Sequence, residues 1–131
     1  MREWTMRLVN WAFLGGLFLS LAGPAVAGEV FSFDQVRAGL NSNRIHLVDV
    51  REAEEFADGH VPGAVNLPLS TFKAEQLPPP SDIPVVLMCR SGRRAGQAMT
   101  VAEAAGRSDV SVYTGSMIEW TEKNGPIVTG P

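Results

Sequence analysis

The sequence predicts an α/β domain in which a mainly parallel sheet is covered by helices on both faces. Two apolar runs, Ile45–Val50 and Val85–Met88, have the composition of buried parallel strands. Segments with helical spacing of apolar residues alternate with such runs, and Arg93–Ala105 is the longest. This alternation implies right-handed crossovers and a parallel sheet. Functional side chains are therefore expected beyond the carboxyl ends of the strands.

The first helix has a clear start signal. Ser32 and Gln35 are spaced as a capping box, and the helix that they begin is expected to run to about Leu40.

Met99, Met117 and Trp120 are expected in the core. The other expected elements are, in chain order, a strand at 45–50, a helix at 52–58 ended by Gly59 as a C′ residue, a type II turn at 61–64, a strand at 64–67, a short helix or turn at 70–76, a strand at 85–88, a helix at 93–105, a strand at 110–113 and a helix at 117–123.

Residues 1–27 have the order of parts of a secretory signal peptide. Arg2 and Arg7 precede the apolar stretch Leu8–Ala22, and Ala25–Ala27 then provides an A-x-A cleavage pattern. The apolar stretch is short for a membrane span, which needs about 20 residues. The alternative is an uncleaved N-terminal anchor. The sequence predicts one folded domain at 28–131, periplasmic or secreted, with no stable membrane association after cleavage.

Charge and cysteine content exclude several classes of function. The chain has 11 Lys and Arg against 14 Asp and Glu, and removal of residues 1–27 makes it more acidic, which gives no support for nucleic-acid binding. Cys89 is the only cysteine, so no internal disulfide forms. His46 and His60 are far apart in sequence, and no metal site or cofactor is indicated. A lone thiol in an exported protein needs a reason, and chemistry at the sulfur is the simplest.

The segment Cys89–Arg94 carries that chemistry. Cys89 directly follows the strand at 85–88, where a helix should begin, and three arginines follow within five residues. Helix N–H groups and positive charge favour a thiolate. Arginines at a helix N-terminus oppose the helix dipole, and a nearby anionic site explains their presence. The alternative is that Cys89 is only a small buried residue.

Three stretches resemble the rhodanese (thiosulfate sulfurtransferase) family, in its single-domain exported form. The stretch 47–68 resembles the first signature, Cys89–Arg94 resembles the C-x-x-G-x-R active loop, and 114–126 resembles the closing segment. The closing segment departs from the family at Ser116, where a second glycine is common, which puts the local turn in doubt. The resemblance implies a three-layer domain with a five-stranded parallel sheet in the order 3-2-4-5-1 and the cysteine strand in the centre.

The resemblance also implies transfer of sulfane sulfur. Cys89 would attack thiosulfate or a similar small sulfur-containing anion, form a persulfide and pass the sulfur to cyanide or a thiol, with a protein acceptor as a further alternative. We expect Arg90 and Arg94 to contact the substrate, because arginine forks suit oxyanions. Ser91, Gly92 and Arg93 complete the binding loop. Gly92 lets the backbone close around the sulfur, and the loop N–H groups form an anion nest.

Three residues of the first signature are expected to support the site. Asp49 should be buried and accept hydrogen bonds, Arg51 should pair with an acidic neighbour such as Glu55, and His60 should bond to backbone near the turn. Two other functions remain open. One is a persulfide carrier or a rhodanese-like binding module without turnover. The other is a cysteine-based phosphatase, which the C-x4-R spacing of Cys89 and Arg94 disfavours because phosphatase loops are one residue longer.

Overall fold

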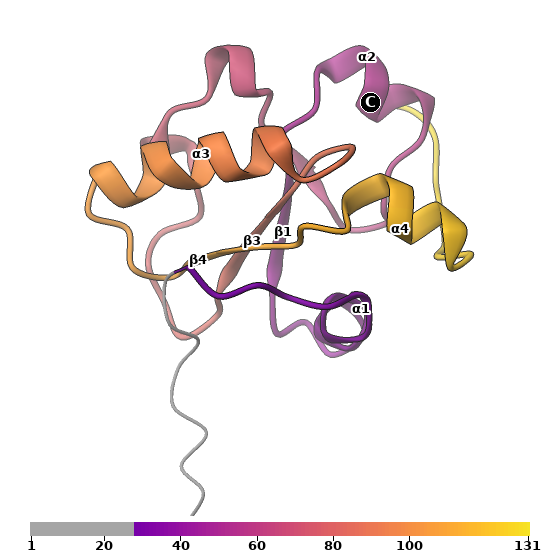
Figure 1. The fold of residues 1–131 in the computed structure, drawn as a ribbon, viewed down its shortest axis with the longest axis horizontal. Helices are drawn as coiled ribbons and strands as arrows, with labels where there is room; N and C mark the ends of the chain where they lie inside the picture. The colour runs from indigo at the N-terminus through magenta and orange to yellow at the C-terminus, as the bar shows by residue number, and fades with distance from the viewer. Residues whose placement is uncertain (1–27) are drawn as a thin grey trace, which may run out of the picture.

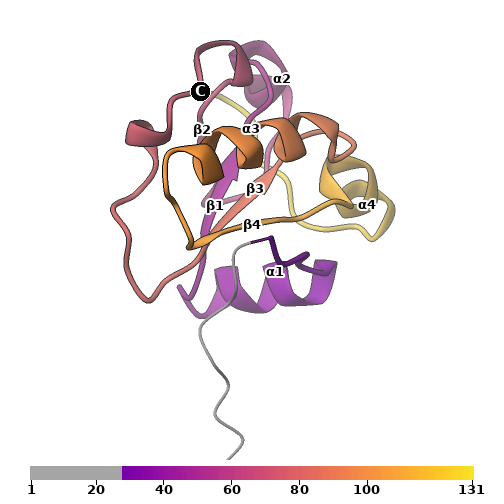
Figure 2. The same ribbon diagram turned by 60° about the vertical axis from the view of Figure 1, so that its left-hand side comes forward.

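The computed structural model describes residues 28–131, and the expected signal segment lies outside them. Four parallel strands form one sheet in the order β2-β1-β3-β4 (Figures 1 and 2). Their bounds are β1 (His46–Asp49), β2 (Val65–Asn66), β3 (Val85–Met88) and β4 (Val110–Val112). The strand that leads to Cys89, β3, lies between β1 and β4, as expected.

The fifth strand of the expected sheet is reduced to a single bridge. Val30 pairs with Val112 in parallel, and the N–H of Phe31 donates to the carbonyl of Val112 at 2.8 Å. Val30 therefore lies beside the last strand, β4, where the first strand of the predicted order belongs. The segment cannot continue as a strand, because Ser32, two residues later, already caps the first helix. The predicted count of five strands is therefore corrected to four.

Helices cover both faces of the sheet (Figures 1 and 2). The long helix α3 (Arg93–Ala104) lies on one face with two 3-10 turns, η1 (Leu69–Thr71) and η2 (Ala74–Gln76). The opposite face carries α1 (Phe33–Asn41) and α4 (Ser116–Glu122), and α2 (Ala53–Asp58) follows the carboxyl end of β1. Within residues 28–131, no helix is long and apolar enough to cross a membrane.

The central strand divides its side chains between two cores. Val85, Leu87 and Cys89 belong to the cluster under α3, whereas Val86 and Met88 belong to the cluster that α1 and α4 cover. This alternation follows from the two-residue period of a strand. It places the Cys89 side chain on the α3 side, where the chain turns back.

Local signals in the sequence are confirmed with one correction. The Ser32–Gln35 capping box is present, with backbone-to-side-chain distances of 2.8 and 3.2 Å. The 61–64 turn closes with a 3.0 Å hydrogen bond, and Gly63 has a φ of +87°. Helix α2 ends before Gly59, but the φ of Gly59 is 165°, which is extended backbone rather than a left-handed cap. A Cβ on Gly59 would lie 3.1 Å from the Ile127 side chain, so close packing accounts for this glycine.

Candidate functional site

The active loop closes around the sulfur of Cys89. The chain leaves β3 at Met88 and enters α3 at Arg93, so it reverses within four residues. The backbone N–H of Gly92 donates to Cys89 Sγ at 3.0 Å. Gly92 has a φ of +97°, in the left-handed region that glycine adopts without a steric cost. Cys89 is 1% exposed, so the sulfur lies inside the loop rather than on the surface.

The start of α3 adds further hydrogen-bond donors. N–H groups in the first turn of a helix have no acceptor within the helix. They belong here to residues that directly follow Gly92, at the positive end of the dipole of a 12-residue helix. Consecutive N–H groups in a turn form an anion-binding concavity. The loop can therefore stabilise a thiolate or a persulfide at Cys89.

The structure places Arg94 in an ion pair. Its guanidinium donates to both carboxylate oxygens of Glu55, at 2.6 and 2.9 Å. The hydrogen bonds from Arg94 lower the pKa of Glu55 from its ordinary 4.5 to about 2, and the pair raises the pKa of Arg94. Arg94 thus connects the active loop to α2, and an oxyanion that used it would compete with Glu55. Ser91 and Arg93 are exposed on the loop.

Asp49 and Arg51 form a buried ion pair at the end of β1. Asp49 is fully buried and accepts the backbone N–H of Arg51 at 3.0 Å and its guanidinium at 2.7 Å. Arg51 also donates to the carbonyls of Gly59 at 2.8 Å and Glu55 at 3.3 Å. Arg51 therefore pairs with an acidic neighbour, as expected, but that neighbour is Asp49 and not Glu55. Asp49 is only two residues away, and Arg94 already holds the Glu55 carboxylate.

His60 supports the turn that follows α2. Its Nδ1 lies 2.8 Å from the carbonyl oxygen of Phe56, and its ring stacks on the Phe56 ring with centroids 3.7 Å apart. Its backbone forms an antiparallel bridge with Val128. The expected backbone bond of His60 is present, in a position that braces α2 against the C-terminal segment.

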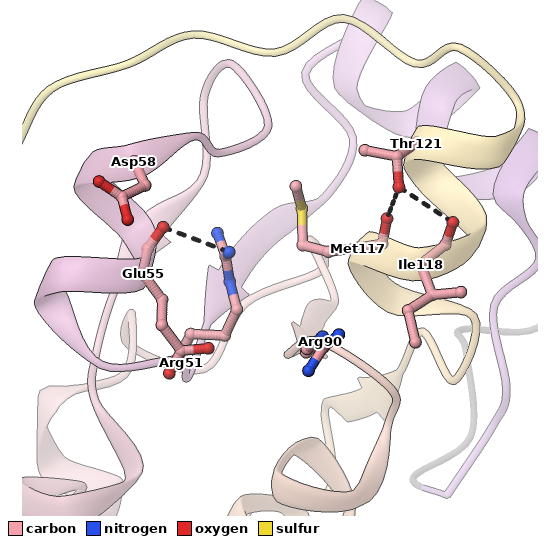
Figure 3. A pocket seen from close by; sticks show the side chains of 7 residues that line it. All are labelled: Arg51, Glu55, Asp58, Arg90, Met117, Ile118 and Thr121. Carbon is pink, nitrogen blue, oxygen red and sulfur yellow. Dashed lines mark hydrogen bonds between the residues drawn. The ribbon is translucent and has the colours of Figure 1, made fainter.

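A cavity of about 460 Å³ opens beside the active loop, between α2 and α4 (Figure 3). Arg51 and Arg90 lie between the two helices, and side chains of both charges meet apolar ones there. The lining residues are Arg51, Glu55, Asp58, Arg90, Met117, Ile118 and Thr121. The sequence indicated Arg51 and Arg90 but not Asp58, Ile118 or Thr121. Asp58 lies on α2 and the other two lie on α4, so only the packing of these helices around the loop brings the three residues to the site.

We expect Gly92→Ala to impair both folding and sulfur chemistry. A Cβ at this position would lie 2.6 Å from the carbonyl oxygen of Thr114, and an alanine would also have to adopt a φ of +97°. The expected loss of stability is about 1–3 kcal/mol. Gly96→Ala is the matched control, because nothing lies within 4 Å of its Cβ in α3; it should gain about 0.4–1 kcal/mol. Urea unfolding measures the stability of both variants. Equal stability of the two variants would contradict the described loop.

The Glu55–Arg94 pair predicts a loss of stability in acid. Because the pKa of Glu55 is lower in the folded protein, its contribution is complete above 4.5 and disappears as the pH falls towards about 2. Glu55→Gln should therefore flatten the stability profile over this interval, and the change should be modest because the pair is partly exposed. Glu54→Gln is the control on the same helix. The two variants are compared by urea unfolding across the pH range, and identical profiles would contradict the assignment.

Comparisons with known proteins agree with this geometry. Residues 32–123 match the model of the rhodanese-like domain. The chain is 35% identical over 106 residues to the human thiosulfate:glutathione sulfurtransferase, covering 70% of this chain and 92% of the human protein. A Saccharomyces cerevisiae protein of the same name is 32% identical over 112 residues, which cover 74% and 81% of the two chains.

Solved structures of related proteins share the fold. The human single-domain sulfurtransferase TSTD1 matches with a TM-score of 0.63 and 34% identity, over 72% of this chain and 96% of that one. The S. cerevisiae single-domain sulfurtransferase RDL2 matches with a TM-score of 0.66 and 33% identity, over 76% and 93%. By its match to the family model and by its identity to these relatives, the chain belongs to the rhodanese-like family.

Proposed function

We propose that this rhodanese-like sulfurtransferase moves sulfane sulfur from thiosulfate or a similar donor to a thiol or cyanide through a persulfide on Cys89. One observation carries the proposal: the Gly92 N–H lies 3.0 Å from a buried cysteine sulfur at the start of α3. Such a setting favours a negative charge on sulfur, both before and after a second sulfur atom is added.

The proposed reaction has two displacement steps. The Cys89 thiolate attacks the outer sulfur of thiosulfate, the S–S bond of the donor breaks, and sulfite leaves with the electron pair. The outer sulfur stays on Cys89 as an anionic persulfide. An acceptor thiolate then attacks that outer sulfur, and the Cys89 thiolate is the leaving group. No external oxidant or reductant is required.

The cavity beside Arg90 suits an acceptor with both charges. Arg90 offers a cation for a carboxylate, Asp58 offers an anion for an ammonium group, and Ile118 adds an apolar surface. The human and yeast relatives are named thiosulfate:glutathione sulfurtransferases. We therefore propose a small zwitterionic thiol such as glutathione as the acceptor. Because Arg94 is paired with Glu55, we propose Arg90 as the first cation that the donor meets.

Three alternatives lead to different results in the same assays. A persulfide carrier would form the persulfide but would turn over slowly with small thiols and faster with a protein acceptor. A phosphatase would hydrolyse aryl phosphates, which the short C-x4-R loop and the close Gly92 contact disfavour. A binding module would neither turn over sulfur nor hydrolyse aryl phosphates.

We expect Cys89→Ser to abolish turnover of thiosulfate with cyanide or glutathione while the protein stays folded. Serine is close to cysteine in shape, but its hydroxyl is a weak nucleophile without a base. Steady-state release of sulfite and of the sulfur product measures the reaction, and thermal unfolding of the variant confirms the fold. Retained turnover in folded Cys89→Ser would contradict the proposed mechanism.

We also propose that the protein is exported and acts in the periplasm or outside the cell. The proposal is supported by the sequence alone, since Ala25–Ala27 follows the apolar stretch Leu8–Ala22. The mature chain should begin at Gly28. Intact mass of the protein from the periplasmic fraction tests this, and a mass that includes residues 1–27, or recovery only from the cytoplasm, would contradict it.

A further inference from the structure

We propose that Ser116 is a positioning residue that fixes the backbone of Cys89 during sulfur transfer. The proposal rests on the proposed function of Cys89 and concerns a residue outside the active loop. Ser116 is the position at which the closing segment departs from the glycine that is common in the family.

The backbone conformation of Ser116 is unfavourable for a serine. Its φ is +52°, in the left-handed region that glycine adopts more readily. The residue is fully buried at the first position of α4. A glycine here would remove the strain, whereas the serine hydroxyl forms two hydrogen bonds that offset it.

The hydroxyl of Ser116 connects two backbone groups. Its Oγ donates to the carbonyl of Tyr113 at 2.8 Å and accepts the N–H of Cys89 at 3.1 Å. Because a hydroxyl has one hydrogen, donation to Tyr113 leaves the oxygen lone pairs for Cys89. No other acceptor for the Cys89 N–H is found among residues 28–131. Without this hydroxyl, a buried N–H would be unpaired at the nucleophile itself.

The same segment holds the other side of the Cys89 backbone. The N–H of Met117 donates to the Cys89 carbonyl at 3.0 Å, and the N–H of Ile118 donates to the Arg90 carbonyl at 3.1 Å. Ser116 completes this arrangement, so three successive residues of α4 bind the start of the active loop. The direction of the Cα–Cβ bond of Cys89 is thereby fixed, with Sγ held 3.0 Å from the Gly92 N–H.

The experiment compares Ser116→Gly and Ser116→Ala with the wild-type full chain. Glycine removes both the strain and the hydroxyl, whereas alanine removes the hydroxyl and keeps the strain. Ser111→Ala is the matched control, because Ser111 is a serine in β4 that is equally buried and whose hydroxyl has no partner among the described residues. Four quantities are measured: the stability in urea, the single-turnover rate of persulfide formation over a range of thiosulfate concentrations, the rate of Cys89 alkylation by iodoacetamide, and the hydrogen exchange of individual amides.

A positioning role separates stability from rate. Ser116→Gly should lose less stability in urea than Ser116→Ala, because both variants leave the Cys89 N–H unpaired but only glycine relieves the strain. Its maximal rates of persulfide formation and alkylation should nevertheless fall about threefold or more, the loss expected from one hydrogen bond, with an unchanged half-saturating thiosulfate concentration. The Cys89 amide should exchange faster, while the Met117 and Ile118 amides stay protected. Ser116→Ala should show the same loss of rate at lower stability, and Ser111→Ala should match the wild type.

A merely structural role gives the opposite result. If Ser116→Gly is as fast as the wild type in alkylation and sulfur transfer, the positioning role is wrong. Unchanged exchange of the Cys89 amide would also overturn it. A wild type that is alkylated at Cys89 but forms no persulfide would refute the proposed function instead, and the alkylation rates would still decide the role of Ser116.

Discussion

The rest of the site depends on the short reversal of the chain between β3 and α3. The N–H of Gly92 meets Cys89 Sγ at 3.0 Å because the backbone at Gly92 takes a φ of +97° that other residues rarely adopt. That conformation also brings Gly92 against the Thr114 carbonyl, where a Cβ has no room. The loop is thus held between its own cysteine and the segment that leads into α4, and the Gly92 N–H faces the sulfur as a consequence.

The arginines near this loop differ in whether an acidic side chain neutralises them. In an acidic chain, two arginines near the site are already neutralised, Arg51 by the buried Asp49 and Arg94 by Glu55. Both pairs hold α2 in place. Arg51 also donates to the carbonyl of Glu55 within the helix and to that of Gly59 just after it, and Arg94 binds the Glu55 carboxylate. Arg90 has no such partner among the described residues and lines the cavity. Arg51 and Arg94 therefore hold the structure around the loop, whereas Arg90 leaves an unneutralised positive charge at the cavity.

Local sequence signals predict much of the fold but only part of the site, because several contacts of the site join residues far apart in the chain. The apolar run Val85–Met88 predicts the central strand, and the helical spacing of apolar residues from Arg93 to Ala105 predicts its helix. The Ser32–Gln35 spacing predicts the first cap. The reduction of the first strand to Val30 was not predictable, since strand length depends on pairing with β4. The Arg94–Glu55 pair joins residues 39 positions apart, so only tertiary packing reveals it. The sequence marks Ser116 as unusual, because glycine is common at this position, but it does not show that the hydroxyl binds the Cys89 N–H and the Tyr113 carbonyl.

The central claim is that Cys89 carries sulfur inside its loop, and intact mass spectrometry tests it most directly. The wild-type protein is incubated with thiosulfate, freed of small molecules and measured under non-reducing conditions, with Cys89→Ser treated alongside. The account predicts that the wild type gains the mass of one sulfur atom, that a thiol or cyanide removes it, and that Cys89→Ser gains nothing. A folded wild type that gains no sulfur, or a variant that gains as much as the wild type, would contradict it.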